Sequence, residues 1–428
     1  MILIALLVLL VLLLVSVPVA ATLIALGLFL DEFFSPFPLV RAMGDVLWSA
    51  SDSFLLIAIP LFILLGEILV RTGIAKGTYR ALESWLSWLP GGLLHANIGT
   101  ATLFSATSGS SVATAATIGT VAIPQGKEMK YDAKLFTGSI AAGGTLGIMI
   151  PPSINLIVYG FLTETSIPQL FAAGLIPGLL LAVLFMVGTA LICMWRPSLG
   201  GPSTHHSWGE RIAGLRHLVP VLILFGIVVG SIYAGWATPT EAASLGVIGA
   251  LLIALFMRKL SLRIIVEALD GTMRTTGMIM LIIIASYFLN FVLASTGVTR
   301  ELTAFLESAG LGPYSTLMLV IVLYIILGFF IETLSLMVIT IPIVAPIVIA
   351  MGFDPVWFGI LLILLIEMAL ITPPVGLNLY VVQGVRQGGS FNDVMLGAMP
   401  YVGIMFIMAI VLILFPSVAM YLPNLVRG

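Results

Sequence analysis

Long apolar stretches recur along almost the whole chain and limit what it can fold into. Residues 2–30, 53–70, 218–233 and 398–422 are examples, and about 20 apolar residues are enough for a helix to cross a hydrocarbon core of roughly 30 Å. Only 8% of the 428 residues are charged, whereas a soluble domain has about 25%. The chain is therefore predicted to be an all-α polytopic membrane protein. Residues 2–30 have no basic segment before them and are predicted to be a retained first span, not a cleaved signal.

A double proline interrupts two of the apolar stretches. "GIMIPPSINLIVYG" begins at Gly147 and "ALITPPVGLNLYVVQG" begins at Ala369. Proline lacks a backbone N–H and clashes with the preceding turn, so both helices are predicted to break inside the membrane. Broken backbone persists at that depth only where it lines a protein-walled or watery cavity. There, freed carbonyl groups suit a hard cation, and the N-terminus of a half-helix attracts a carboxylate.

The two double prolines belong to an internal repeat. Three pairs of landmarks share one spacing of 222 residues: Pro124 and Pro346, Asp132 and Asp354, Pro151 and Pro373. Each half is predicted to contain a span, an amphipathic stretch, a hairpin, a broken span and a long final span. A spacing kept by three landmarks indicates a structural repeat.

The positions of the basic residues predict the orientation of the chain. If the chain alternates sides at each span, 14 of its 17 Lys and Arg residues fall on one side, which the positive-inside rule makes cytoplasmic. The N-terminus is then cytoplasmic and the C-terminus periplasmic. This path requires residues 93–134 and 314–354 to be re-entrant hairpins that open to opposite sides. The two repeats are therefore predicted to have inverted topology, as in many secondary transporters.

Polar residues near the breaks and the hairpin tips form the candidate site. Asn155 and Asn378 follow the two breaks and are predicted to bind a ligand, with capping of the break as the alternative. The first hairpin is predicted to turn at Gly109, Ser110 and Ser111, which present hydroxyl groups and open amides. Close helix packing by small residues is the alternative explanation for that run.

Three acidic residues fall within or beside the predicted membrane segments. Glu332 lies with Thr333 near the tip of the second hairpin, and an acid at membrane depth is a candidate functional group. The alternative is an acid at the outer mouth. Glu67 and Glu367 lie within predicted spans, where each can extend to the interface, take up a proton or pair with a base. The sequence does not choose among these roles.

The sequence lacks the signatures of an enzyme. It has no phosphate-binding P-loop and no paired catalytic residues, so uphill transport would have to use an ion gradient. A net charge of −2 gives no sign of a nucleic-acid partner. Three alternatives stay open beside an ion-coupled transporter with a binding protein: a stand-alone sodium/carboxylate symporter, a membrane-embedded enzyme and a passive channel.

Five stretches resemble the large membrane subunit (DctM type) of tripartite ATP-independent periplasmic (TRAP) transporters. They are "AIPLFILLGEIL" from Ala58, "SGSSVATAATIGTVAIP" from Ser108, "YDAKLFTGSIAAGGTLGIMIPPSINLIVYG" from Tyr131, "SIPQLFAAGLIPGLL" from Ser166 and "TPPVGLNLYV" from Thr372. The resemblance covers essentially the whole chain. It implies sodium-coupled uptake, across a bacterial inner membrane, of an organic anion such as sialic acid or a C4-dicarboxylate.

The resemblance also implies partners and a mechanism. A soluble periplasmic binding protein would deliver the substrate, and a small four-helix membrane subunit would come from a separate chain. In the implied elevator mechanism, a transport domain slides against a scaffold. The implied division is 1–90 (scaffold and arm helices), 91–165 (first transport half), 166–310 (scaffold, cytoplasmic linker and arm helices), 311–390 (second transport half) and 391–428 (terminal scaffold helix).

The resemblance further implies ligands for ions and substrate. A first sodium ion would lie near Ser108, Gly109, Ser110 and Gly144. A second sodium ion would lie near Thr333, Thr340, Thr372 and Pro373. The substrate carboxylate would lie between Ser111, Asn155 and Asn378.

Overall fold

The chain folds as a bundle of helices. The computed structural model describes residues 2–202, 206–308 and 310–426, and this part of the chain contains no strand. Six of the described helices are long and apolar enough to cross a membrane, and two bent helix pairs would bring the number to eight. The prediction of an all-α, multi-pass membrane protein is confirmed.

The first and last apolar stretches are each divided into two helices. α1 (Ile2–Leu14) and α2 (Val19–Phe34) are separated at Pro18, and α21 (Phe391–Leu414) and α22 (Ser417–Val426) are separated at Pro416. Proline can begin a helix, but within a helix it removes a hydrogen bond and clashes with the preceding turn. No single helix therefore fills residues 2–30 or 398–422, although α21 by itself is long and apolar enough to cross a membrane.

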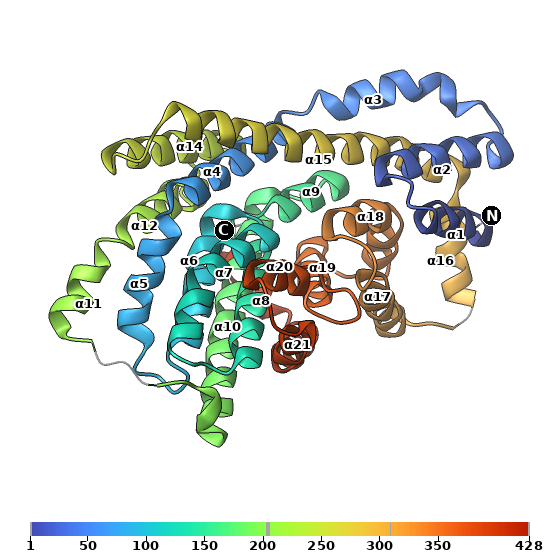
Figure 1. The fold of residues 1–428 in the computed structure, drawn as a ribbon. Helices are drawn as coiled ribbons and strands as arrows, with labels where there is room; N and C mark the ends of the chain where they lie inside the picture. The colour runs from blue at the N-terminus through green and yellow to red at the C-terminus, as the bar shows by residue number, and fades with distance from the viewer. Residues whose placement is uncertain (1, 203–205, 309, 427–428) are drawn as a thin grey trace.

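Three long helices lie across one side of the molecule (Figure 1): α4 (Ala58–Thr72), α14 (Pro239–Phe256) and α15 (Leu262–Thr296). α4 packs against both of the others, and α2 packs against α15. Arg71 joins α4 to α15, because its guanidinium lies 2.9 Å from Glu67 and 3.2 Å from Glu267. Of the three roles open to Glu67, pairing with a base is the one the structure has.

Two helical hairpins lie beside these helices. α6 (Leu93–Ser108) and α7 (Ser111–Glu128) form the first, and α17 (Pro313–Gly328) and α18 (Thr333–Ala350) form the second. The first hairpin turns at Gly109, whose φ of 59° favours glycine, and at Ser110, which caps α7. The predicted turn is confirmed at Gly109 and Ser110, whereas Ser111 is already the first residue of α7.

Two broken helices follow the hairpins. α8 (Ala133–Met149) and α9 (Ile154–Thr163) bend by 41° at the first double proline, and α19 (Pro355–Leu370) and α20 (Leu377–Arg386) are separated at the second. Asp132 and Asp354 cap α8 and α19, each accepting two backbone N–H groups. Helix lengths recur between the halves: α7 and α18 have 18 residues each, and α9 and α20 have 10 each.

The remaining helices connect and cover these units. They are α3 (Met43–Ser51), α5 (Ile74–Leu86), α10 (Ile167–Trp195), α11 (Trp208–Leu215), α12 (Val219–Phe225), α13 (Ser231–Tyr233) and α16 (Val298–Ser308). α21 packs directly against α8, because a Cβ at Gly138 would lie 2.1 Å from the carbonyl carbon of Gly397. Only glycine allows this crossing, so α21 is fixed closely to the first broken helix.

Candidate functional site

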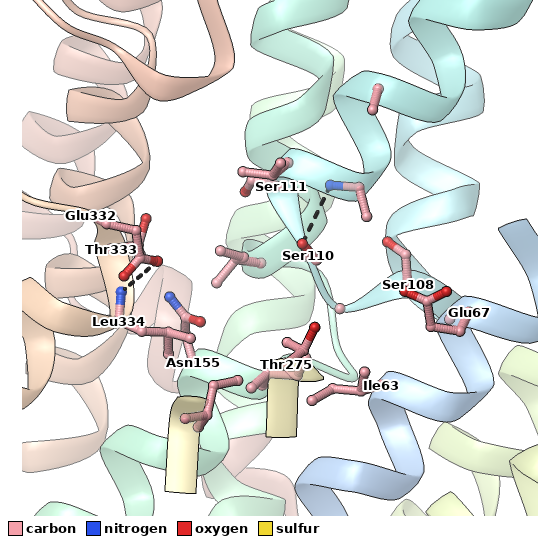
Figure 2. Close-up of a pocket in the computed structure, with 18 of the residues that line it drawn as sticks. Ile63, Glu67, Ser108, Ser110, Ser111, Asn155, Thr275, Glu332, Thr333 and Leu334 are labelled. Carbon is pink, nitrogen blue, oxygen red and sulfur yellow. Dashed lines mark hydrogen bonds between the residues drawn. The ribbon is translucent and has the colours of Figure 1, made fainter. Parts of the chain in front are cut away.

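A cavity of about 360 Å³ lies between the first hairpin, α9 and α18 on one side and α4 and α15 on the other. We call it the central cavity. Figure 2 shows Ser110 and Ser111 on one wall, Glu332 and Thr333 across from them, and Asn155 between the two walls. Segments far apart in the sequence therefore present polar groups to one space.

The first turns of three helices meet at the central cavity. α7 begins at Ser111, α9 begins at Ile154 and α18 begins at Thr333. The first N–H groups of a helix have no partner within the helix, and they carry part of the positive end of the helix dipole. This arrangement favours a negatively charged ligand.

The capping residues leave two of these three ends open to an anion. Glu332 caps α18, and its carboxylate accepts the N–H groups of Leu334 and Ser335 at 3.0 Å each. α7 and α9 are capped by the neutral hydroxyl groups of Ser110 and Ser153. The positive ends of α7 and α9 therefore stay without a countercharge from their caps, whereas the end of α18 already has one.

The two asparagines are buried and incompletely paired. Asn155 lines the central cavity, and its Nδ2 has no hydrogen-bond partner in the described part of the chain. Asn378 is fully buried, and its Nδ2 donates to the carbonyl of Ala141 at 3.4 Å while its Oδ1 has no partner there. The capping alternative is wrong for both, because Ser153 caps α9 and no side chain caps α20.

The residues of the first predicted sodium site come together. Ser108, Gly109 and Ser110 line the central cavity. Gly144 lies behind the hairpin turn, where a Cβ would lie 3.0 Å from the Nδ2 of Asn378 and 3.1 Å from the carbonyl oxygen of Ser111. Asn378 itself does not line the central cavity but lies beside Gly144, a residue of the first predicted sodium site.

The second predicted sodium site is less well assembled. Thr333 lines the central cavity, whereas Thr340, Thr372 and Pro373 do not. The hydroxyl of Thr340 is hydrogen-bonded with Tyr324 and with a carbonyl of its own helix. The hydroxyl of Thr372 donates to the carbonyl of Met368 at 2.6 Å.

Sequence reasoning missed the hydrogen bond between the two halves at this site. Ser111 donates its hydroxyl proton to Glu367, which lies on α19, is fully buried and has no other partner in the described part of the chain. The acid within an apolar helix was a visible signal, but its partner, 256 residues away, was not. The contributions of Ile63 on α4 and Thr275 on α15 to the cavity wall were also missed.

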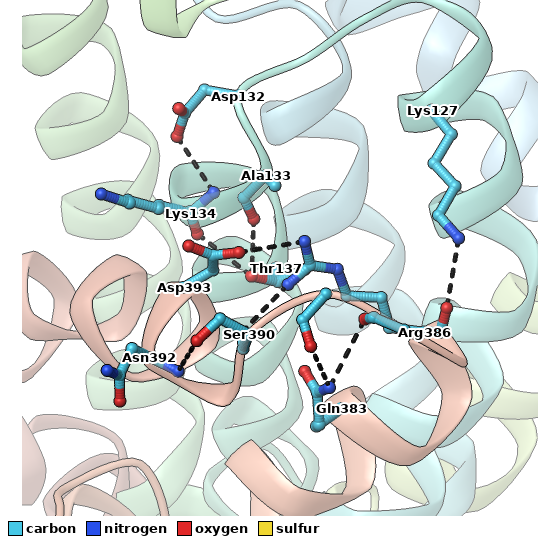
Figure 3. Close-up of polar contacts among 12 residues, drawn as sticks. Lys127, Asp132, Ala133, Lys134, Thr137, Gln383, Arg386, Ser390, Asn392 and Asp393 are labelled. Carbon is cyan, nitrogen blue, oxygen red and sulfur yellow. Dashed lines mark hydrogen bonds and ion pairs between the residues drawn. The ribbon is translucent and has the colours of Figure 1, made fainter.

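A polar cluster holds the half-helix that carries Asn378 (Figure 3). Lys127 at the end of α7 donates to the backbone carbonyl of Arg386 at 3.2 Å, and Arg386 pairs with Asp393 of α21 at 3.1 Å. Only 10% of the Arg386 side chain and 24% of the Asp393 side chain are exposed. α20 is therefore fixed to both the first hairpin and α21.

The chain matches known transport proteins over most of its length. Residues 6–418 match the family model described as "Tripartite ATP-independent periplasmic transporter, DctM component". The C4-dicarboxylate TRAP transporter large permease protein DctM of Pseudomonas aeruginosa is 34% identical over 386 residues, which is 90% of each chain. The sialic acid TRAP transporter large permease protein SiaM of Vibrio cholerae is 33% identical, over 88% of each chain.

A solved structure shares the fold. The Alcanivorax borkumensis YdaH transporter is only 15% identical in sequence, but the structural alignment includes 95% of this chain and 99% of the YdaH chain, with a TM-score of 0.56. The relatives are named as permease components and not as enzymes. The family match over nearly the whole chain, together with the helical, multi-pass fold, shows that this chain belongs to the DctM family of TRAP transporter large permease subunits.

Proposed function

We propose that the chain carries out sodium-coupled uptake of an organic anion that a soluble periplasmic binding protein delivers. A small membrane subunit on a separate chain completes the complex in the bacterial inner membrane. The observation that carries the proposal is the central cavity, where the N-termini of α7 and α9, both capped by neutral hydroxyl groups, meet the unpaired amide of Asn155.

The central cavity suits a carboxylate. Backbone N–H groups at the starts of α7 and α9 and the Nδ2 of Asn155 are donors, and a carboxylate is an acceptor only. Charge-assisted hydrogen bonds of this kind are about twice as strong as neutral ones. A neutral ligand would gain less from the same groups.

Oxygen groups around the first hairpin turn suit a sodium ion. The Oδ1 of Asn378 is a buried carbonyl oxygen without a partner in the described residues, and the Nδ2 of the same side chain and the carbonyl oxygen of Ser111 both lie close to Gly144. Hard cations take oxygen ligands, so these groups fit the ion. We assign Ser108, Gly109, Ser110 and Gly144 to this site and add Asn378. Thr333, Thr340, Thr372 and Pro373 stay as the proposed second site.

The proposed mechanism is an elevator with inverted repeats. The matching helix lengths of the two halves support the repeat, and the charge pattern supports opposite orientations with a cytoplasmic N-terminus. The hairpins and broken helices move together as the transport domain, while α4, α14 and α15 belong to the scaffold. The close crossing of α8 and α21 favours carrying α21 with the transport domain, although the sequence boundary at residue 391 places it in the scaffold.

Uptake into proteoliposomes tests the substrate class and the need for partners. Liposomes that hold this chain with its small subunit receive labelled sialic acid or labelled succinate, each with and without the cognate binding protein. Uptake of one acid that requires the binding protein supports the tripartite proposal and names the substrate class. Uptake that is equal without the binding protein supports a stand-alone symporter instead.

A further inference from the structure

A second cavity, of about 430 Å³, lies away from the central cavity, where α5 meets the start of α12 and the end of α14. We call it the basic pocket, because Lys76, Arg80, Arg216, His217 and Lys259 line it and no acidic residue does. In the proposed orientation it lies at the cytoplasmic surface of the membrane.

The positive charge of the basic pocket is not balanced by ion pairs. Elsewhere in the chain several arginines pair with acids, as Arg386 does. Among the described residues, Lys76, Arg80, Arg216 and Lys259 form no ion pair. Arg80, Arg216 and His217 also line an adjacent cavity that contains the acids Glu83 and Glu210, whereas Lys76 and Lys259 line the basic pocket alone. An anion that entered the basic pocket would therefore find several unpaired cationic groups.

Glycines keep the basic pocket open along α5. A Cβ at Gly77 would lie 3.1 Å from Nδ1 of His217, and a Cβ at Gly73 would lie 3.7 Å from Nζ of Lys259. Gly73 has a φ of 67° and is also required by the turn between α4 and α5. Gly77 lies inside a helix, where its backbone does not require glycine, so its lack of a side chain serves the packing of His217 and the space beside it.

Exposed apolar side chains flank the basic pocket. Val219 and Leu222 on α12 are 47% and 49% exposed, and Leu255 and Phe256 at the end of α14 are 57% and 84% exposed. The positive-inside rule accounts for basic residues on this side of the chain, but not for their gathering around one cavity. A ligand with an anionic head and apolar chains matches both the charge and the flanks.

We propose that the basic pocket binds the phosphate headgroup of an anionic phospholipid, with the acyl chains lying along α12 and α14. The guanidinium groups of Arg80 and Arg216 offer paired N–H donors to phosphate oxygens, and Lys76 and Lys259 add ammonium charges. Basic pockets between membrane helices bind lipid headgroups in this way. This lipid site is separate from the transport site and does not depend on the proposed substrate.

Phosphatidylglycerol binding by the purified, delipidated full chain tests the proposal. The test variant is Lys76→Gln/Arg80→Gln/Lys259→Gln, whose three positions are exposed. The matched control is Lys130→Gln/Lys134→Gln/Arg196→Gln, which removes the same charge at three exposed positions outside the basic pocket. Native mass spectrometry measures bound lipid, with phosphatidylcholine as the uncharged comparison and sn-glycerol 3-phosphate as the headgroup without chains. Circular dichroism checks that both variants are folded.

The wild-type chain and the control are expected to prefer phosphatidylglycerol to phosphatidylcholine and to retain it equally, within about twofold. The test variant is expected to bind phosphatidylglycerol at least tenfold more weakly. Equal binding by the test variant and the wild type would overturn the proposal. Binding of sn-glycerol 3-phosphate as tight as that of the lipid would also overturn it, because the site would then be one for a soluble phosphate ester.

Discussion

The hydrogen bond from Ser111 to Glu367 gives the most specific prediction about how the two halves are held together. Ser111→Ala removes the only partner of the Glu367 carboxyl group in the described part of the chain. A buried polar group that loses its partner costs about 1–3 kcal/mol, and more if it is charged. Because Glu367 is fully buried, we expect Ser111→Ala to lower the free energy of unfolding by about 2 kcal/mol.

A double variant separates this bond from other effects of the substitution. Replacing both partners by apolar groups of similar shape is nearly neutral, so Ser111→Ala/Glu367→Met is expected to recover to within about 1 kcal/mol of the wild type. Thr120→Ala, an exposed position on the same helix, is the control and should change stability by less than about 0.5 kcal/mol. Reversible unfolding by SDS in mixed micelles measures the free energies. A Ser111→Ala variant as stable as the Thr120→Ala control would refute the reasoning.

Three further predictions concern the substrate site, a helix crossing and an ion pair. Asn155→Ala should lower the kcat/KM of uptake at least tenfold because a free donor is lost, whereas exposed Asn392→Ala should not; equal rates would contradict this role. Gly397→Ala should destabilise the fold by about 1–3 kcal/mol, because the added methyl group would clash with α8, whereas Gly403→Ala, with open space around it, should not. Similar unfolding free energies of the two variants would argue against the close crossing. Arg386→Gln should lower the free energy of unfolding by about 1–2 kcal/mol, and Arg274→Gln by less than about 0.5 kcal/mol, because the side chains of Arg274 and its partner Asp270 are 79% and 60% exposed. Equal losses in SDS unfolding would show that burial of the Arg386 pair has no effect.

Local rules predict the breaks and turns of this fold. The double prolines end α8 and α19 because no helix accommodates them in its interior, and Gly109 turns the first hairpin because the turn needs a positive φ. The same rule applies at Pro18 and Pro416, where single prolines separate two helices within a continuous hydrophobic stretch. Hydrophobicity finds a membrane segment but not the end of its helix, and a single proline does not always end one, since Pro124, Pro177 and Pro346 lie inside helices.

Contacts between distant helices could not be predicted in the same way. The bond from Ser111 to Glu367 and the crossing of Gly138 and Gly397 depend on how the two halves pack, which no local pattern encodes. The spacing of the repeat aligns equivalent residues but does not indicate which residues meet. For this reason the residues of the first hairpin turn could be predicted as a group, whereas the place of Asn378 behind the turn required the structure.

Dependence of uptake on the sodium gradient tests the central claim most directly. Labelled substrate uptake is followed in proteoliposomes with the complete transporter and binding protein, under an inward sodium gradient, under equal sodium on both sides, and with potassium in place of sodium. We predict accumulation above the outside concentration only under the inward sodium gradient, and its collapse when an ionophore dissipates the gradient. Accumulation that is unchanged when potassium replaces sodium would contradict the account.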